Sequence, residues 1–118
     1  MGSLCSLKKI KLSGLKLTQD LSEVLEALSS GCLSDRLESL YLDSCELSGH
    51  LTDQLLLFRN LADLSLSRNS ISGPIPVSLG LPASLRTLDL SRNRVNGTLP
   101  ESIGQLWKME KLWLSHNM

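Results

Sequence analysis

Leucines recur along this chain in a pattern that repeats every 24 residues. The template L-x-x-L-x-L-x-x-N-x-L begins at Leu61 and again at Leu85, and a copy with Cys45 in the Asn position begins at Leu37. A further copy opens at Met109 and reaches the last residue of the sequence. In each copy the L-x-L alternation has the period of two that predicts a short strand burying every second side chain.

The first unit is longer than the others. It begins at Leu7 and carries about six extra residues before the next unit opens at Leu37. Four apolar residues in this insert follow helical spacing: Leu21, Val24, Leu25 and Leu28. Gly31 suits the position after the last turn of a helix, so the pattern predicts a short helix over Leu21–Ser30.

No single unit can cover its own apolar face, so the units must stack in parallel and share one continuous core. Units starting at about residues 7, 37, 61, 85 and 109 therefore predict one curved solenoid over residues 1–118, with the last unit truncated. We expect Asn69 and Asn93 to bond turn backbone groups inside the stack. Cys45 fits that position as a small buried residue, whereas Leu15 cannot replace the amide and predicts an irregular first turn.

A glycine follows the Asn position at a fixed offset, and prolines follow in the motifs Gly73-Pro74-Ile75-Pro76 and Gly97-Thr98-Leu99-Pro100. These residues turn the chain off the strand. The unit resembles the plant-specific class of leucine-rich repeats, L-x-x-L-x-L-S-x-N-x-L-S-G-x-I-P. The resemblance implies an α/β repeat solenoid with a parallel concave sheet, a second short strand introduced by G-x-I-P, and 3-10 turns and loops on the convex side. Thr52 replaces the usual Pro, which weakens the expectation of that second strand in its unit.

The first unit narrows the resemblance. Cys5-Ser6-Leu7, an acidic amphipathic insert and Cys32 are similar to the ectodomain of plant receptor-like proteins, and look closest to receptors of the fungal ethylene-inducing xylanase type. The resemblance implies a ligand-recognition segment of a plant cell-surface receptor in defence signalling, at the extracellular face of the plasma membrane. The implied partner is a protein or peptide ligand, with a co-receptor as a second candidate. The membrane would enter only through parts of the parent protein outside this sequence.

The concave face of such a solenoid is where ligands bind, because the residues between buried leucines point outward in columns. Tyr41 and Trp113 offer rigid rings with a polar handle, which are favoured at interfaces. A solvated surface is the alternative interpretation for both. The strand-end column of Gly14, Ser44, Arg68, Arg92 and His116 is interpreted as solvated charge. The predicted ligand-binding residues are Lys11, Tyr41, Asp43, Ser65, Asp89 and Trp113.

Charge and hydropathy remove several function classes. Twelve basic residues balance twelve acidic ones, so no global field attracts nucleic acid or an anionic membrane. The longest apolar run, 55–58, is far shorter than the ~20 residues that span a bilayer. The N-terminus lacks the features of a secretory signal, so either the protein stays inside the cell or its true start lies upstream.

The sequence contains no recognisable catalytic motif. We therefore expect no enzyme activity, no cofactor and no bound metal. His50 and His116 are the only histidines and lie repeats apart, and no nucleophile elbow or phosphate loop occurs. The three cysteines lack metal-ligand spacing. If the protein is secreted, we expect a glycan on Asn96, in the one N-x-S/T motif, and a disulfide between Cys5 and Cys32, which precede the leading leucines of adjacent units. Two alternatives stay open: a secreted inhibitor of a microbial cell-wall hydrolase, and a truncated product without function.

Overall fold

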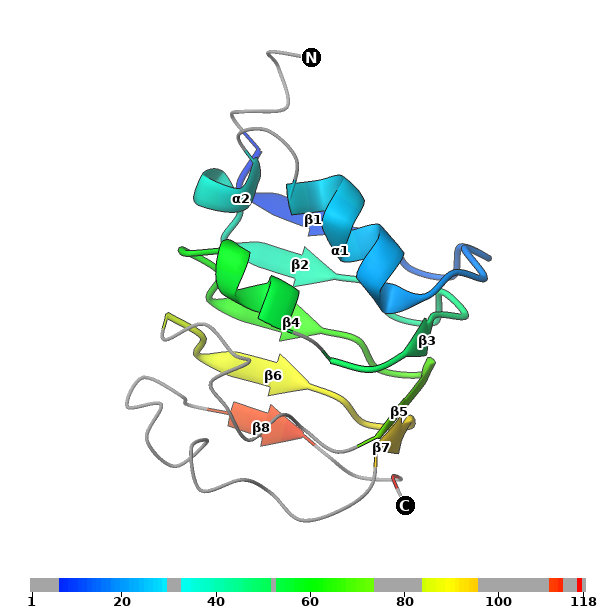
Figure 1. The fold of residues 1–118 in the computed structure, drawn as a ribbon. Coiled ribbons are helices and arrows are strands. Elements are labelled where there is room, and N and C mark those ends of the chain that lie inside the picture. Colours follow the sequence, from blue (N-terminus) through cyan, green and yellow to red (C-terminus); the bar gives the residue numbers. More distant parts are fainter. Residues whose placement is uncertain are drawn as a thin grey trace.

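The main layer of the molecule is a five-stranded parallel sheet (Figure 1). The computed structural model describes residues 7–29, 33–51, 53–73, 84–95, 111–113 and 117. The strands lie in the order β1-β2-β4-β6-β8. Their bounds are β1 Lys9–Lys11, β2 Ser39–Tyr41, β4 Asp63–Ser65, β6 Thr87–Asp89 and β8 Lys111–Trp113.

The strands pair in the register that the sequence period predicts. Leu40 lies opposite Leu64, Leu64 opposite Leu88, and Leu88 opposite Leu112. The insert in the first unit does not disturb this order, because Ile10 of β1 still pairs with Leu40. Corresponding residues of successive units therefore form straight columns, and the α/β repeat solenoid with a parallel sheet is confirmed.

A second, three-stranded sheet runs beside the first in the order β3-β5-β7, with bounds Ser48–Gly49, Ser70–Gly73 and Arg94–Val95. The resemblance to plant-specific repeats implied that G-x-I-P introduces this strand, which is wrong for the described strands, because none of them extends beyond the glycine of that motif. β3 and β5 end at Gly49 and Gly73, whose φ angles of 92° and 80° take the backbone out of the extended region. Thr52 does not prevent the strand in its unit, since β3 precedes it.

Helical segments cover the convex side of the sheet (Figure 1). Helix α1 spans Leu21–Ser29, which confirms the helix predicted from the spacing of the insert; Gly31 lies outside the described residues. One turn of helix, α2 at Leu33–Arg36, was not predicted. The 3-10 helix η2 at Asp53–Leu57 agrees with the expected convex turns. In the first two units the convex layer is therefore helical.

The core lies between the sheet and these helices. Leu40, Leu64 and Leu88 are at most 1% exposed, and the L-x-L partners Leu42 and Leu66 are fully buried. Three residues of the convex layer reach the same cluster and are also fully buried: Leu21, Leu25 and Phe58. Because the units that start at about residues 7, 37, 61 and 85 all contribute to one cluster, the stability of each of these units depends on its neighbours.

Side-chain amides bond each turn to the turn before it. Asn69 Oδ1 accepts hydrogen bonds from the backbone N–H of Cys45 at 2.9 Å and of Leu47 at 3.0 Å, and its Nδ2 donates to the carbonyl of Leu42 at 3.0 Å. Asn93 accepts from Ile71 N at 3.0 Å in the same way. The ladder expected from the sequence is thus present, and each amide serves the preceding unit.

Cys45 replaces the amide in its own turn and is fully buried. Its thiol cannot provide the carbonyl oxygen that Asn offers, so the N–H of Leu17 donates instead to the backbone carbonyl of Cys45 at 3.1 Å and to that of Leu15 at 3.0 Å. Leu15 is 46% exposed, and Thr18 takes a φ of 45°. The first turn is irregular, as Leu15 predicts.

Candidate ligand-binding face

The central column of the concave face contains one residue from each of the five strands. Strand pairing places Lys11 beside Tyr41, Tyr41 beside Ser65, Ser65 beside Asp89, and Asp89 beside Trp113. Lys11, Tyr41, Ser65 and Asp89 each follow an isoleucine or leucine that packs in the core, so strand parity turns their side chains to the opposite face. Trp113 has the same register position on β8. The column is a direct consequence of the leucine pattern.

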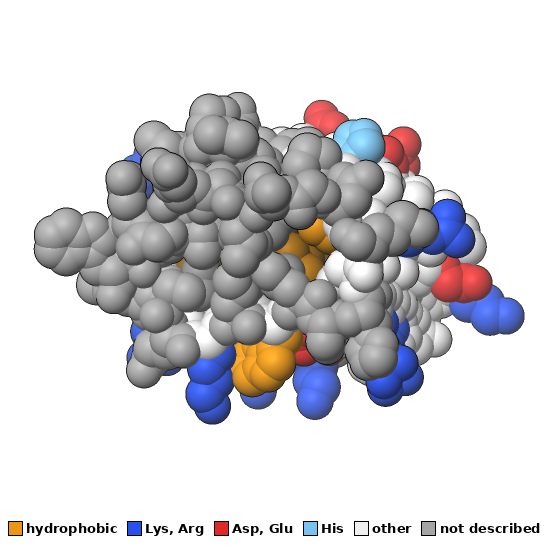
Figure 2. All heavy atoms as spheres, turned by 90° about the horizontal axis from the view of Figure 1, so that it is seen from below, with side chains coloured by type: hydrophobic (Ala, Val, Ile, Leu, Met, Phe, Trp, Pro, Cys, Tyr) orange, Lys and Arg blue, Asp and Glu red, His pale blue; other side chains and the backbone are white. Residues whose placement is uncertain are grey.

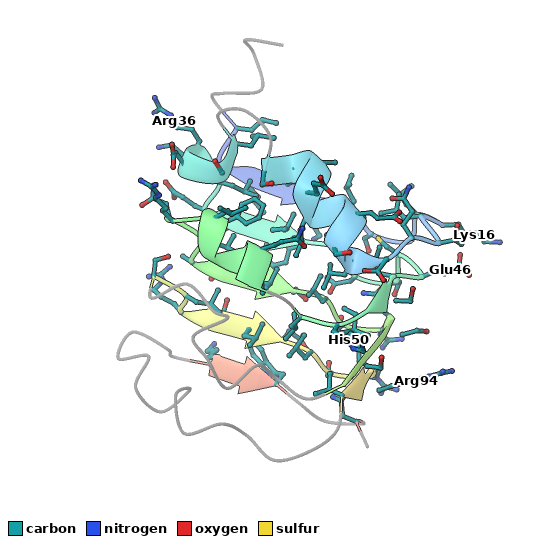
Figure 3. All side chains as sticks on the ribbon, in the orientation of Figure 1. Lys16, Arg36, Glu46, His50 and Arg94 are labelled. Atoms are coloured by element: carbon teal, nitrogen blue, oxygen red, sulfur yellow. The ribbon has the colours of Figure 1, made fainter. Side chains whose placement is uncertain are left out.

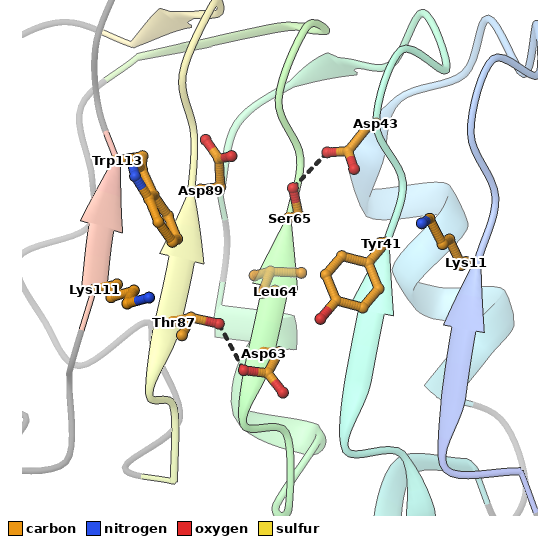
Figure 4. A pocket seen from close by; sticks show the side chains of 10 residues that line it. All are labelled: Lys11, Tyr41, Asp43, Asp63, Leu64, Ser65, Thr87, Asp89, Lys111 and Trp113. Carbon is orange, nitrogen blue, oxygen red and sulfur yellow. Dashed lines mark hydrogen bonds between the residues drawn. The ribbon is translucent and has the colours of Figure 1, made fainter.

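A hollow of about 430 Å³ lies along this column (Figure 4). Ser65 is small and only 7% exposed, and it stands in the column between the larger Tyr41 and Asp89. Trp113, on the last strand, is 45% exposed. The hollow is lined by Lys11, Tyr41, Asp43, Asp63, Leu64, Ser65, Thr87, Asp89, Lys111 and Trp113.

Three aspartates of the hollow accept hydrogen bonds from neutral donors. Asp43 Oδ1 accepts from the hydroxyl of Ser65 and, at 2.8 Å, from the hydroxyl of Ser67. Asp89 Oδ1 accepts from the N–H of Ser91 at 3.0 Å and from its hydroxyl at 2.6 Å. These donors fix the carboxylates in place, but a hydroxyl or an amide does not neutralise their charge.

Asp63 bridges three strands. Its Oδ2 accepts from the Ser39 hydroxyl at 3.0 Å on β2. Its Oδ1 accepts from the Thr87 hydroxyl at 2.7 Å on β6, a bond drawn in Figure 4. Both donors occupy the same column as Asp63, one strand to either side. The bridge holds the floor of the hollow in one arrangement before any ligand arrives.

Two lysines lie beside the two aromatic rings. Lys9 Nζ is 5.4 Å from the centroid of the Tyr41 ring, and Lys111 Nζ is 5.9 Å from that of Trp113. These distances are within the range of cation–π attraction. Viewed from the β8 end, Lys and Arg side chains project along one side of the molecule with hydrophobic side chains between them (Figure 2). Each ring therefore already lies beside a lysine of the same chain.

All six residues predicted to bind a ligand line this hollow: Lys11, Tyr41, Asp43, Ser65, Asp89 and Trp113. The sequence-based selection missed Asp63, Thr87 and Lys111, which occupy the column two residues earlier on their strands. Strand parity already turned that column outward. The sequence pattern does not show the hydrogen bonds between Asp63 and its neighbours, because these form only when the strands stack.

Other predicted positions lie outside the described residues. These are the disulfide pair Cys5 and Cys32, the glycosylation position Asn96, and His116 at the end of the strand-end column. The described cysteine, Cys45, is a free thiol.

The strand-end column has an unusual backbone. Ser44, Arg68 and Arg92 take positive φ angles of 55°, 58° and 59°, at the position where the first unit has Gly14 with 77°. A left-handed residue here turns the chain so that the next side chain enters the Asn ladder. The strand-end column therefore has a structural role in the turn. Elsewhere, the labelled side chains of Lys16, Arg94 and other charged residues point away from the core at the edges of the molecule (Figure 3).

Neither a metal site nor a membrane span is found in the described part of the chain. No group of three His, Cys, Asp or Glu side chains there is arranged to hold a metal ion. None of the helices described is long and apolar enough to cross a bilayer. One carboxyl outside the hollow is perturbed: the N–H and hydroxyl of Ser22 hold the pKa of Asp20 below its usual value. That bond caps α1, so it is a feature of folding.

Comparisons with known proteins agree with this geometry. Residues 60–81 and 84–106 match the model of the family described as Leucine Rich Repeat. The fold is similar to a structure described as plant peptide hormone receptor RGFR1 in complex with RGF2, with a TM-score of 0.79 and 29% identity, and to PEPR1-AtPEP1, with 0.75 and 28%. A search of curated protein sequences finds no match.

The match covers 98% of this chain but only 18% and 19% of the two receptor chains, so the sequence spans less than a fifth of their length. The chain is a leucine-rich-repeat solenoid, and it is similar to ectodomains of plant leucine-rich-repeat receptors.

Proposed function

We propose that the chain is the ligand-recognition part of a plant cell-surface receptor ectodomain and that it binds a peptide or protein segment across the concave sheet. The observation that carries the proposal is the hollow between Tyr41 and Trp113, whose floor is already fixed by hydrogen bonds. A preorganised surface loses little conformational freedom on binding, and rigid aromatic rings supply contact area. The likeness to a plant peptide hormone receptor in complex with RGF2, and to PEPR1-AtPEP1, supports peptide binding.

The same proposal includes the receptor type, its biological role, its location and its covalent modifications. The parent protein would be a receptor-like protein of the fungal ethylene-inducing xylanase receptor type, act in defence signalling without enzyme activity, and engage a co-receptor. It would stand at the extracellular face of the plasma membrane, held there by parts outside this sequence. In that compartment Asn96 would carry a glycan, and Cys5 and Cys32 would form a disulfide.

A selection from a displayed random-peptide library tests the central claim. Peptides enriched on the 118-residue chain are measured by fluorescence anisotropy against the wild type and against Tyr41→Ala and Trp113→Ala. Leu57→Ala is the matched control, because Leu57 is a comparably exposed apolar residue, at 51%, on η2 of the convex side.

Each ring deletion is expected to weaken binding about tenfold or more, the effect of a modest interface hot spot, whereas the Leu57 variant binds normally. If the selected peptides bind all three variants as they bind the wild type, the concave hollow is not the binding site.

A further inference from the structure

The lining of the hollow contains more negative than positive charge, with three aspartates against two lysines, Lys11 and Lys111. Asp43, Asp63 and Asp89 line it, and their hydrogen bonds come from hydroxyls and backbone amides. Among the described residues an ion pair joins Arg59 to Asp35 at 3.8 Å, and neither residue lines the hollow. Since the carboxylates outnumber the lysines, the floor favours a ligand group that brings positive charge.

The carboxylates also keep unused acceptor capacity. Within the described residues, Asp43 and Asp89 accept through Oδ1 alone, and each has a second oxygen. An ionised carboxylate has about four acceptor sites, so Asp63, which already accepts two hydrogen bonds, can accept another. Several acceptors around one small residue, Ser65, match a donor group with many N–H bonds in one plane.

The aromatic rings of Tyr41 and Trp113 favour a flat cation, such as a guanidinium, over a compact one, such as an ammonium. The chain's own ammonium groups already lie 5.4 and 5.9 Å from the Tyr41 and Trp113 rings, so both rings attract cations. A guanidinium is planar, is less strongly hydrated than an ammonium, and stacks on aromatic faces while it donates through its edge. Arginine meets both requirements with one side chain.

We propose that the hollow binds an arginine side chain of the peptide ligand, with its guanidinium over Ser65, held by Asp43 and Asp89 and flanked by Tyr41 and Trp113. The inference rests on the proposed peptide-binding function and adds the chemical class that the site selects. Lys11 and Lys111 at the ends of the hollow disfavour further basic residues in the ligand next to that arginine.

The test uses heptapeptide pools with blocked ends and a fixed central residue: arginine, its uncharged isostere citrulline, lysine or glutamate. The other six positions are randomised without Arg or Lys. Affinity for the full 118-residue chain is measured at neutral pH and low salt, where exposed charges are least screened. The arginine pool is expected to bind about tenfold tighter than the citrulline pool, as for the loss of one charge-assisted hydrogen bond.

The matched variants remove two negative charges in different places. Asp43→Asn with Asp89→Asn keeps an acceptor oxygen at each position and removes the charge, so the arginine preference is expected to disappear. Glu23→Gln with Glu26→Gln makes the same charge change on exposed positions of α1 and is expected to leave the preference intact. Circular dichroism melting checks that both variants fold.

The outcomes separate the two proposals. If the arginine and citrulline pools bind the wild type equally, or the glutamate pool binds best, the arginine inference is wrong while peptide binding stands. The arginine inference is also wrong if the α1 variant loses the preference as fully as the aspartate variant does, because the effect is then one of net charge. If none of the pools binds the wild type and the displayed library also yields no binder, the proposed function fails, and the inference with it.

Discussion

The thiol of Cys45 lies 3.0 Å from the carbonyl oxygen of Leu12 and donates a hydrogen bond to it. In the next unit Asn69 Nδ2 bonds the carbonyl of Leu42, also at 3.0 Å, so the thiol performs the donor half of the asparagine's role. It cannot perform the acceptor half. The ladder is therefore weaker between the first two units than between the later ones.

Asn69→Ala is expected to destabilise the chain more than Cys45→Ala. Asn69 satisfies the backbone N–H groups of Cys45 and Leu47 and the carbonyl of Leu42, and unsatisfied groups cost about 1–3 kcal/mol each when buried. We expect a loss of about 3 kcal/mol or more for Asn69→Ala and about 1–2 kcal/mol for Cys45→Ala. Urea unfolding measures both, and equal losses would contradict the unequal roles of the two side chains.

Leu66→Ala is expected to cost about 2–5 kcal/mol through lost burial and the cavity left behind, since Leu66 is fully buried. Tyr41→Ala, one residue away from the buried Leu42 on the opposite face of the sheet, is expected to change stability by less than about 1 kcal/mol. Thermal melting of the two variants separates the faces. An early melt for Tyr41→Ala would mean that its ring supports the core.

Gly49→Ala is expected to be more damaging than Gly14→Ala. Both glycines have a positive φ, which costs a residue with a Cβ about 1–2 kcal/mol. An added Cβ at Gly14 meets nothing within 4 Å, whereas at Gly49 it lies 2.6 Å from Asp20 Oδ1. Adding Asp20→Ala to Gly49→Ala removes that clash, so a double-mutant cycle should give a coupling of about 1 kcal/mol. Strictly additive losses would argue against the contact.

Acid is expected to weaken the cap of α1. Hydrogen bonds from the N–H and hydroxyl of Ser22 lower the pKa of Asp20 from its usual 3.8, and the positive charge of His50 adds to this. A lowered folded-state pKa means that the cap stabilises the protein fully above the unfolded pKa and is lost as pH falls through the folded one. Urea midpoints for the wild type and Asp20→Asn should therefore keep a constant difference from about pH 7 to 5 and shift in favour of the variant below about pH 4. A constant difference down to pH 2 would show that Asp20 does not titrate differently on folding.

The sequence by itself determined the repeat, its period and the parity of the strands. A leucine at every second strand position must face a core, and a 24-residue spacing must bring equal positions of successive units side by side. Those two facts are sufficient to place Tyr41, Ser65, Asp89 and Trp113 in one outward column. Helical spacing likewise located α1, because an amphipathic insert has to bury its leucines against the same core.

The tertiary structure decided what the columns form together. The hollow depends on the small Ser65 beside larger neighbours, and on the bonds of Asp63 to Ser39 and Thr87, which lie 24 residues away in either direction. It also showed that the second strand extends no further than the glycine, and it revealed the turn of α2. Periodicity in one chain segment reports which face a residue occupies. The depth and charge of a surface depend on side chains from several stacked units, and only their packing determines them.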